Sequence, residues 1–192
     1  TCLQLPFTQA LHTAAALGAE AVEIDARREI RPGELSRTGL RQVRKMLEDR
    51  NLRVCALRFH TRRGYDVSAD LERRVEATKQ ALRLAHDLGC SIVVNQVGQV
   101  PADSTGEAWD QLRAVLLDLG DYGQRIGALL AAETGSEEGA ALARLLAALP
   151  VGYLTVNLNP GRLLVNGFSP REALEALGPH VVHVPATDAM RD

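Results

Sequence analysis

The sequence contains little lysine and few cysteines, and both shortages exclude kinds of chemistry. Lysine occurs only at Lys45 and Lys79. Both lie in segments with helical periodicity, so no lysine is placed at a strand end to form a Schiff base with a substrate. The three cysteines, Cys2, Cys55 and Cys90, are odd in number and lack C-x-x-C spacing, and each lies in or beside an apolar run. We therefore expect buried, reduced cysteines and no aldolase-type reaction.

Long apolar runs are also missing. No stretch approaches the roughly 18 uninterrupted apolar residues of a membrane span, and no basic-then-apolar leader opens the chain. We expect a soluble, cytoplasmic protein with no membrane partner. The chain begins at Thr1, so the question of a targeting segment before this residue is left open. The net charge of -2, with acidic and basic residues interspersed, indicates no nucleic-acid partner.

Short apolar runs alternate with longer segments of helical period throughout the 192 residues. The length and the 46% hydrophobic content suit a single domain over residues 1–192. Strands separated by helices predict a parallel sheet. The expected strands are seven, at residues 1–5, 21–25, 53–59, 91–96, 128–133, 153–157 and 181–184.

The ends of several helices are marked by glycine or serine. Gly18, Gly89 and Gly178 each follow a leucine just before an expected strand, where a helix commonly ends on a residue with positive φ. Ser169 precedes Pro170 and stands three residues before a glutamate, which predicts a capping box. We also expect caps at three further positions, Thr8, Ser68 and Ser136.

The fold class that this pattern favours is α/β, a parallel (β/α)8 TIM barrel with about seven units present and the final βα unit absent. A doubly wound open sheet is the alternative, but the glycine-rich phosphate loop that would follow its first strand is missing. In a barrel, the segments 27–39, 61–67 and 99–106 follow strands and lie at the carboxyl end, where sites are built.

Several expected strands end in polar residues. The side chains at the last inward positions of barrel strands converge on one pocket, so these endings identify candidate site residues. They are E-I-D at 23–25, N-Q at 95–96, E-T-G at 133–135, N-L-N-P at 157–160 and H-V-P-A-T-D at 183–188.

Three of these motifs, in this order, resemble the xylose-isomerase-like sugar isomerase/epimerase barrels. They are E-T-G at 133–135, N-P-G-R-L-L at 159–164 and H-V-P-A-T-D-A at 183–189, and the segments 17–23 and 88–94 are more weakly similar to helix-to-strand junctions of that family. The resemblance implies a sugar (phosphate) isomerase or epimerase. It extends over the whole chain.

The resemblance also implies a metal site that this sequence alters. Active relatives hold Mn, Mg or Zn with a glutamate, an aspartate, a histidine and a second glutamate from strand eight. Here Glu133 matches, but Asn159 stands at the aspartate position and Pro185 at a histidine position, and strand eight is absent. Hard cations prefer anionic oxygen ligands, so we expect no bound metal and no cofactor in this chain. A shifted register that recruits His183 and Asp188 is the alternative.

We expect Glu133 and His183 to be the catalytic residues. A carboxylate that ends the apolar run 128–132 is costly to bury unless it is paired or used, so either an acid/base role or a structural salt bridge follows for Glu133. His183 is interpreted as a substrate or catalytic group, or as a satisfied polar residue of the barrel interior.

The loop at 59–66 is expected to bind substrate, because arginine forks bind anions and tyrosine stacks on sugars. Pairing of Arg63 with Asp66 in a solvated loop is the alternative, and Arg162 could equally face water. The expected substrate-binding residues are Arg62, Arg63, Tyr65, Asn95, Asn159, Arg162 and Asp188.

These observations favour a sugar isomerase/epimerase-like protein that moves a proton on a small hydroxylated carbonyl compound and is inactive if the missing ligands are essential. The alternatives are a non-catalytic sugar-binding or protein-interaction barrel and, third, an apurinic-endonuclease-like nuclease. An unclosed barrel would expose strand edges. Either further residues, another segment or a second copy in a homo-oligomer would have to cover them.

Overall fold

The computed structural model describes residues 3–187 and 189 and contains six parallel strands that alternate with helices. No helix in this part of the chain is both long and apolar enough to cross a bilayer. The elements are α1 (Phe7–Ala16), β1 (Ala21–Asp25), α2 (Arg37–Glu48), β2 (Arg53–Arg58), α3 (Leu71–Asp87), β3 (Ile92–Asn95), α4 (Glu107–Ile126), β4 (Leu129–Glu133), α5 (Gly139–Ala147), β5 (Leu154–Asn157), α6 (Pro160–Val165), α7 (Pro170–Leu177), the 3₁₀ turn η1 (Gly178–His180) and β6 (Val181–His183).

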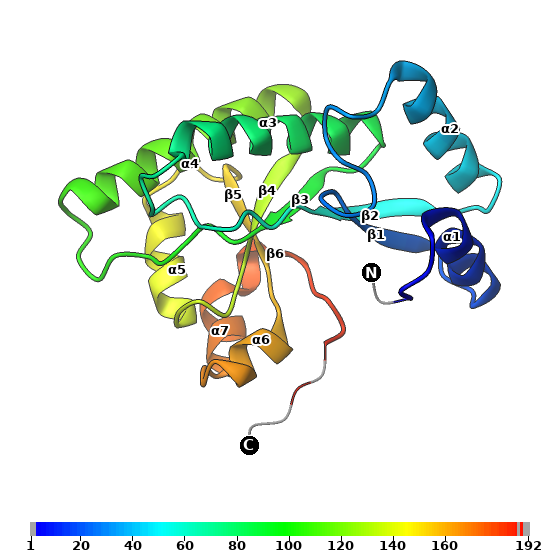
Figure 1. Cartoon of the computed structure of the whole chain (residues 1–192). Helices are drawn as coiled ribbons and strands as arrows, with labels where there is room; N and C mark the ends of the chain where they lie inside the picture. Colours follow the sequence, from blue (N-terminus) through cyan, green and yellow to red (C-terminus); the bar gives the residue numbers. More distant parts are fainter. Residues whose placement is uncertain (1–2, 188, 190–192) are drawn as a thin grey trace.

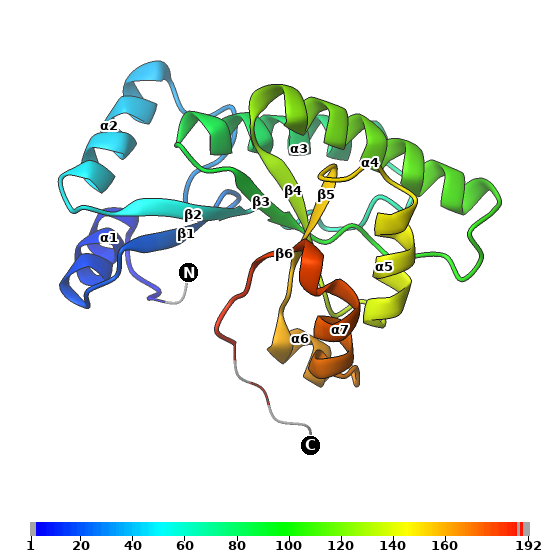
Figure 2. The ribbon, with the colours of Figure 1, turned by 180° about the vertical axis from the view of Figure 1, so that it is seen from behind.

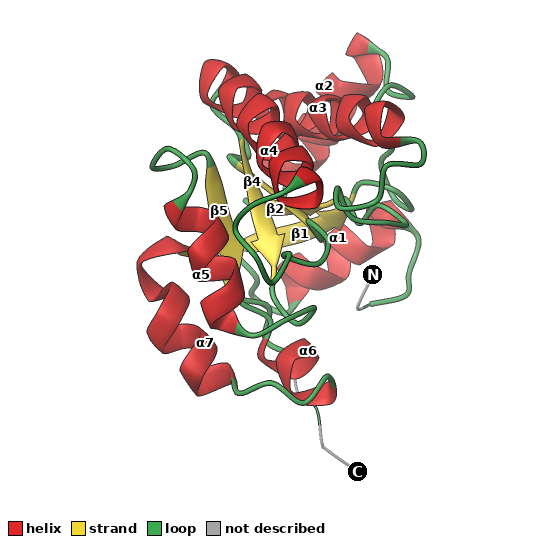
Figure 3. Cartoon of the chain, turned by 90° about the vertical axis from the view of Figure 1, so that its left-hand side faces the viewer, coloured by secondary structure: helices red, strands yellow, loops and turns green. Residues whose placement is uncertain are grey.

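The strands form one curved sheet in the order β1-β2-β3-β4-β5-β6, with each strand parallel to the next. Figures 1 and 2 show this sheet from opposite sides, with α3 and α4 lying side by side over it. The architecture is a half-barrel, which confirms the expected fold class. Figure 3 shows the strands enclosed on their outer side by helices.

The expected first strand at residues 1–5 is wrong in its described part. Leu3 lies in a turn, Leu5 in a bend, and the backbone of Gln4 has a φ of 50°. A left-handed residue in the middle of the segment breaks the extended geometry that pairing requires. The described chain therefore contains six strands where seven were expected.

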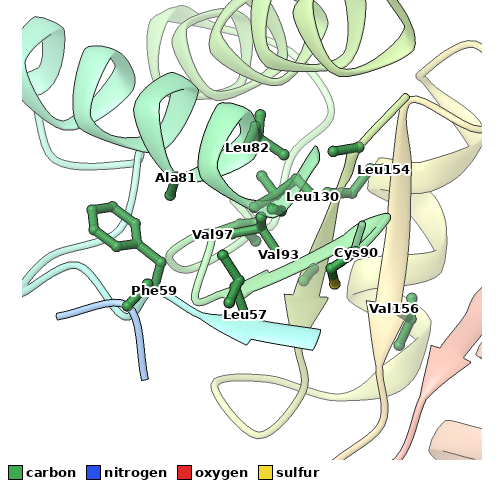
Figure 4. Close-up of a cluster of buried hydrophobic side chains, with 14 of the residues drawn as sticks. Leu57, Phe59, Ala81, Leu82, Cys90, Val93, Val97, Leu130, Leu154 and Val156 are labelled. Atoms are coloured by element: carbon green, nitrogen blue, oxygen red, sulfur yellow. The ribbon is translucent and has the colours of Figure 1, made fainter. Parts of the chain in front are cut away.

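Alternation along each strand gives the sheet two different faces. Large apolar side chains on the outer face, such as Leu57, Val93 and Leu130, pack with Leu82 of α3 in the main core (Figure 4). Small side chains at the intervening positions form a separate cluster of three residues, Ala56, Val94 and Ala131. Because these inward positions carry so little bulk, the polar residues at the strand ends have room on the inner face.

The expected glycine junctions are confirmed at two of three places. Gly18 and Gly89 follow α1 and α3 with φ values of 81° and 73°, in the region that favours glycine. Gly178 is different, because α7 continues into η1 and the glycine there has a φ of -43°. The leucine-glycine pattern alone does not distinguish a helix that stops from one that tightens into a 3₁₀ turn.

Helix capping follows the prediction at Ser169, whose hydroxyl accepts a hydrogen bond from the backbone N–H of Glu172 with Pro170 in the first turn. Three other expected caps are wrong. The N-cap residues of α1, α3 and α5 are Pro6, Asp70 and Glu138 in place of Thr8, Ser68 and Ser136.

Cys55 and Cys90 are free thiols, half-buried and buried respectively, and Cys2 lies outside the described residues. Burial raises the pKa of both thiols. A protonated thiol is a poor nucleophile, so the structure gives these cysteines packing roles.

Candidate active site at the carboxyl ends of the strands

Polar side chains from both ends of the sheet meet on its inner face. Arg58 at the end of β2 forms ion pairs with Glu23, at 3.6 Å, and with Asp25, at 3.5 Å. On the other side, Nδ1 of His183 in β6 lies 2.8 Å from Oδ1 of Asn157 in β5. Nε2 of the same histidine is 3.9 Å from Oε2 of Glu23, so side chains of the first and last strands approach each other across the concave face.

Glu133 lies at the centre of this arrangement. It ends β4, only 7% of its surface is exposed, and three groups surround its carboxylate. Nε2 of His60 is 3.1 Å from Oε2, Nδ2 of Asn159 donates to Oε1 at 3.1 Å, and the guanidinium of Arg162 forms an ion pair with Oε2. The carboxylate is therefore buried but compensated, as a buried charge must be.

These neighbours decide the protonation of Glu133. Burial by itself raises the pKa of the carboxyl group, but His60, Asn159 and Arg162 outweigh it and lower the pKa from 4.5 to about 2. Glu133 is consequently a carboxylate throughout the neutral range.

The start of α6 places two of these three neighbours. Asn159 is the N-cap, and its Oδ1 accepts from the backbone N–H of Arg162 at 3.0 Å, which leaves its Nδ2 for Glu133. Gly135 makes the approach of Arg162 possible, since its φ is 112° and a Cβ there would lie 2.5 Å from the arginine Cγ. Arg162 also donates to Oε1 of Gln96 at 3.3 Å, so it does not face open water.

The two expected catalytic residues are joined indirectly. Nδ2 of Asn157 is 3.5 Å from Oε1 of Glu133, a weak contact, and Oδ1 of the same amide bonds His183. The amide of Asn157 thus links Glu133 to His183 without direct contact between them.

Two expected substrate-binding residues lie in the core, and that expectation is corrected. Tyr65 has no exposed surface, and its hydroxyl bonds Thr78 at 2.7 Å and accepts from Nδ2 of Asn95 at 2.8 Å. Asn95 is likewise fully buried, and its Oδ1 accepts from the backbone N–H of Thr61. A ring enclosed by α3 cannot stack on a sugar, so this pair anchors the loop after β2.

The remaining expected substrate-binding residues lie in two parts of the structure, a separate cleft and the Glu133 cluster, and one lies outside the described residues. Arg62 and Arg63 are exposed and line a cleft outside the Glu133 cluster, and Arg63 forms no ion pair with Asp66 in the described structure. Asn159 and Arg162 contact Glu133, as described above. Asp188 lies outside the described residues.

Sequence reasoning missed His60 and Arg58. Arg58 ends β2 and His60 lies two residues after it, so both continue the two-residue spacing from the inward Ala56, and this spacing is the signal that could have identified them. Their partners are distant in the sequence, so nothing local indicated that they would meet carboxylates.

A half-barrel with polar groups gathered at the carboxyl ends of its strands is the arrangement of (β/α)8-barrel proteins, which build their sites there. The family model described as xylose isomerase-like TIM barrel matches residues 11–192. The chain therefore belongs to the xylose isomerase-like TIM barrel family. No curated protein matches the sequence significantly.

Solved structures share this fold at low sequence identity. A xylose isomerase domain protein from Planctomyces limnophilus has a TM-score of 0.82 and 21% identity, covering 91% of this chain and 65% of that one. D-psicose 3-epimerase, solved in the presence of D-fructose, has a TM-score of 0.77 and 15% identity, covering 97% and 72%. A xylose isomerase-like barrel from Mycobacterium smegmatis in complex with magnesium has a TM-score of 0.72 and 16% identity. The match covers 91% of this chain and 63% of that one. The chain thus spans about two thirds of their lengths.

The residues around Glu133 do not fit the divalent metal that the resemblance implies. The guanidinium of Arg162 contacts the carboxylate that would bind the cation, and two positive charges would repel each other there. The neighbouring ligand candidates, Asn157 and Asn159, are neutral amides already bonded to His183 and to Arg162. Within the described residues no group of three or more His, Cys, Asp or Glu side chains is placed to hold a metal.

Proposed function

We propose that this protein is a sugar isomerase/epimerase-like enzyme that moves a proton next to the carbonyl carbon of a small hydroxylated compound. The observation that supports it is the Glu133 cluster, in which one ionised carboxylate lies beside the guanidinium of Arg162 and the imidazole of His60 at the carboxyl ends of the strands. Removal of such a proton needs a base and a group that stabilises the enediolate oxygen.

Glu133 is the base in this proposal, and substrate binding activates it. With a pKa of about 2 the free carboxylate is weakly basic. A substrate whose oxygens accept hydrogen bonds from Arg162 and His60 draws these donors away from Glu133. Burial, which alone raises the pKa, then makes the same carboxylate a stronger base.

Arg162 supplies positive charge in the proposed reaction, and His60 supplies a second N–H donor. Both already contact Oε2 of Glu133, so an oxygen beside that atom receives their donors as its negative charge develops. His183, oriented by the amide of Asn157, is a second titratable group on the same face and is assigned the return of the proton.

Solvent deuterium exchange into candidate ketoses tests the proposal. Native protein is expected to catalyse exchange, and Glu133→Gln is expected to abolish it because the amide cannot accept the proton. Glu138→Gln is the matched control, since Glu138 is exposed in the same loop and caps no helix with its side chain. Exchange that survives in the Glu133→Gln protein would remove Glu133 from the mechanism.

The closed ion pairing of Glu133 also supports a second candidate, a non-catalytic barrel that binds a sugar-like ligand. In that case Arg162 and His60 stay on Glu133 and only neutralise a buried charge. Sugar binding without exchange in the native protein, and unchanged by Glu133→Gln, would favour this candidate.

A further inference from the structure

A cleft outside the Glu133 cluster has arginine as its most frequent lining residue. The cleft has a volume of about 600 Å³ and is bounded by the loop after β1, the loop after β2 and the first turns of α3. Figure 1 shows the loop after β1 between α2 and α3. Two acidic residues, Glu34 and Asp70, line the cleft together with six arginines, Arg27, Arg31, Arg62, Arg63, Arg73 and Arg74.

Three of these arginines are held in place by the protein. Nη1 of Arg27 donates to the carbonyl of His60 at 2.9 Å, and its guanidinium lies over the ring of Phe59. Arg31 pairs with Glu34 at 3.2 Å. Arg74 donates to the backbone carbonyls of the segment before α3, and its Nε is buried without a hydrogen-bond partner in the described structure.

The other three arginines have their guanidinium groups available. Within residues 3–187 and 189, the side chains of Arg62, Arg63 and Arg73 form no ion pair or hydrogen bond, and all three are exposed. They come from two different segments, the loop after β2 and the first turn of α3. Unpaired cations facing one cleft from separate elements repel one another unless an anion lies between them.

The chemistry of the cleft therefore favours a doubly charged ligand. Guanidinium forks bind phosphate oxygens bidentately, whereas a neutral sugar does not compensate charge. Six cations against two carboxylates leave an excess of four positive charges in a protein whose net charge is -2. A volume of this size also holds more than the phosphate group alone.

We propose that the cleft binds the phosphate group of a phosphorylated sugar substrate. This inference rests on the proposed function and names its substrate class. The two sites share a segment, because His60 contacts Glu133 while Thr61 lines the cleft and Arg27 bonds the carbonyl between them. A phosphate held by the arginines directs the sugar toward His60 and Glu133.

Isothermal titration with fructose 6-phosphate, fructose and inorganic phosphate tests the proposal. Native protein is expected to bind fructose 6-phosphate at least tenfold more tightly than fructose. The double variant Arg62→Gln/Arg63→Gln is expected to lose roughly tenfold or more of that affinity, with fructose binding unchanged, because two charged hydrogen-bond donors are removed. Arg73→Gln removes the exposed cation that α3 contributes to the same cleft, and it tests the site from that side.

The control is Arg41→Gln/Arg44→Gln, which makes the same change in net charge on the exposed surface of α2 and is expected to bind like native protein. Equal affinity of native protein and the double variant for fructose 6-phosphate would overturn the proposal. Binding of inorganic phosphate without binding of the sugar phosphate would also overturn it.

Glu133→Gln separates this inference from the catalytic proposal. The variant is expected to keep the part of the affinity that depends on Arg62 and Arg63 while losing deuterium exchange. Loss of that arginine-dependent affinity in Glu133→Gln would count against a distinct phosphate site. If native protein shows the arginine-dependent affinity for fructose 6-phosphate but no deuterium exchange, only the catalytic proposal is contradicted and the phosphate site stands.

Discussion

Glu133 shows how single side chains determine the character of this site. Its carboxylate is almost completely buried, yet the contacts with His60, Asn159 and Arg162 keep it ionised. The contacts that lower its pKa also stabilise the folded state, because a group whose pKa is lower in the folded protein makes stability depend on pH.

We expect the contribution of Glu133 to stability to disappear in acid. The folded pKa of about 2 is below the ordinary 4.5, so this contribution is fully present above about pH 4.5 and is lost as the pH falls toward 2. The difference corresponds to roughly 3 kcal/mol at neutral pH. Urea denaturation at pH 6 and pH 3.5 measures the free energy of unfolding. Between these two pH values it should fall by about 1 kcal/mol more in the native protein than in Glu133→Gln.

Glu138→Gln is the control for this measurement and should follow the native protein. Glu137, whose pKa burial raises to about 7, is common to all three proteins and cancels in the comparison. If the free energy of unfolding depends on pH in the same way in native protein and in Glu133→Gln, Glu133 is not held ionised in the folded state.

The site residues differ in how far the sequence could predict them. Glu133 was predictable because a carboxylate after an apolar run has few structural uses. The contact of His60 with Glu133 was not, because it depends on how two separate strands are placed in the sheet. Tyr65 was assigned to the wrong environment because its burial comes from Thr78 and Asn95, which neighbour it only in three dimensions.

At the scale of secondary structure, a residue with a Cβ is strained at a helix-to-strand junction only where the backbone has a positive φ. Gly89 has a φ of 73° and Gly178 a φ of -43°, and a Cβ added at either position would meet no atom within 4 Å. The two positions therefore differ in backbone conformation and not in available space.

We expect Gly89→Ala to lower the free energy of unfolding by about 1 kcal/mol or more, because alanine is strained at positive φ. Gly178→Ala is the matched control and should leave stability unchanged or slightly increased, since alanine restricts the unfolded chain. Thermal and urea unfolding of both variants checks this. Equal destabilisation at both positions would contradict the assigned backbone geometry.

The elements themselves were largely predictable, because each observed strand coincides with an apolar run and each long helix with a 3.6-residue period. The segment 1–5 shows the limit of this approach. Its apolar residues alternate like those of a strand, but alternation does not provide the neighbouring strand or the backbone geometry that pairing needs.

At the scale of the whole molecule, the sheet formed by the described residues is open at both sides. In the described residues β1 and β6 each pair with one neighbour. Val182 and Val184, in and just after β6, are exposed. An unpaired edge with apolar side chains favours association with another chain.

We therefore expect the 192-residue polypeptide to self-associate through β6 when nothing else covers that edge. Val182→Lys/Val184→Lys should shift it toward monomer, because edge lysines oppose pairing. Val165→Lys is the control, since Val165 is also an exposed valine but lies on α6. Light scattering at several concentrations measures the change, and association that is the same in all three proteins would place the contact elsewhere.

The strand order also has a consequence for how the molecule folds. Each strand pairs with the strand that precedes it in the chain, so every new βα unit finds its partner already synthesised. The approach of His183 to Glu23 is an exception, because it joins residues 160 positions apart in the chain. Closure of the polar inner face accordingly requires β6, the last of these strands to be synthesised, and ribosome-bound chains that end before residue 181 should pair β1 to β5 but lack this contact.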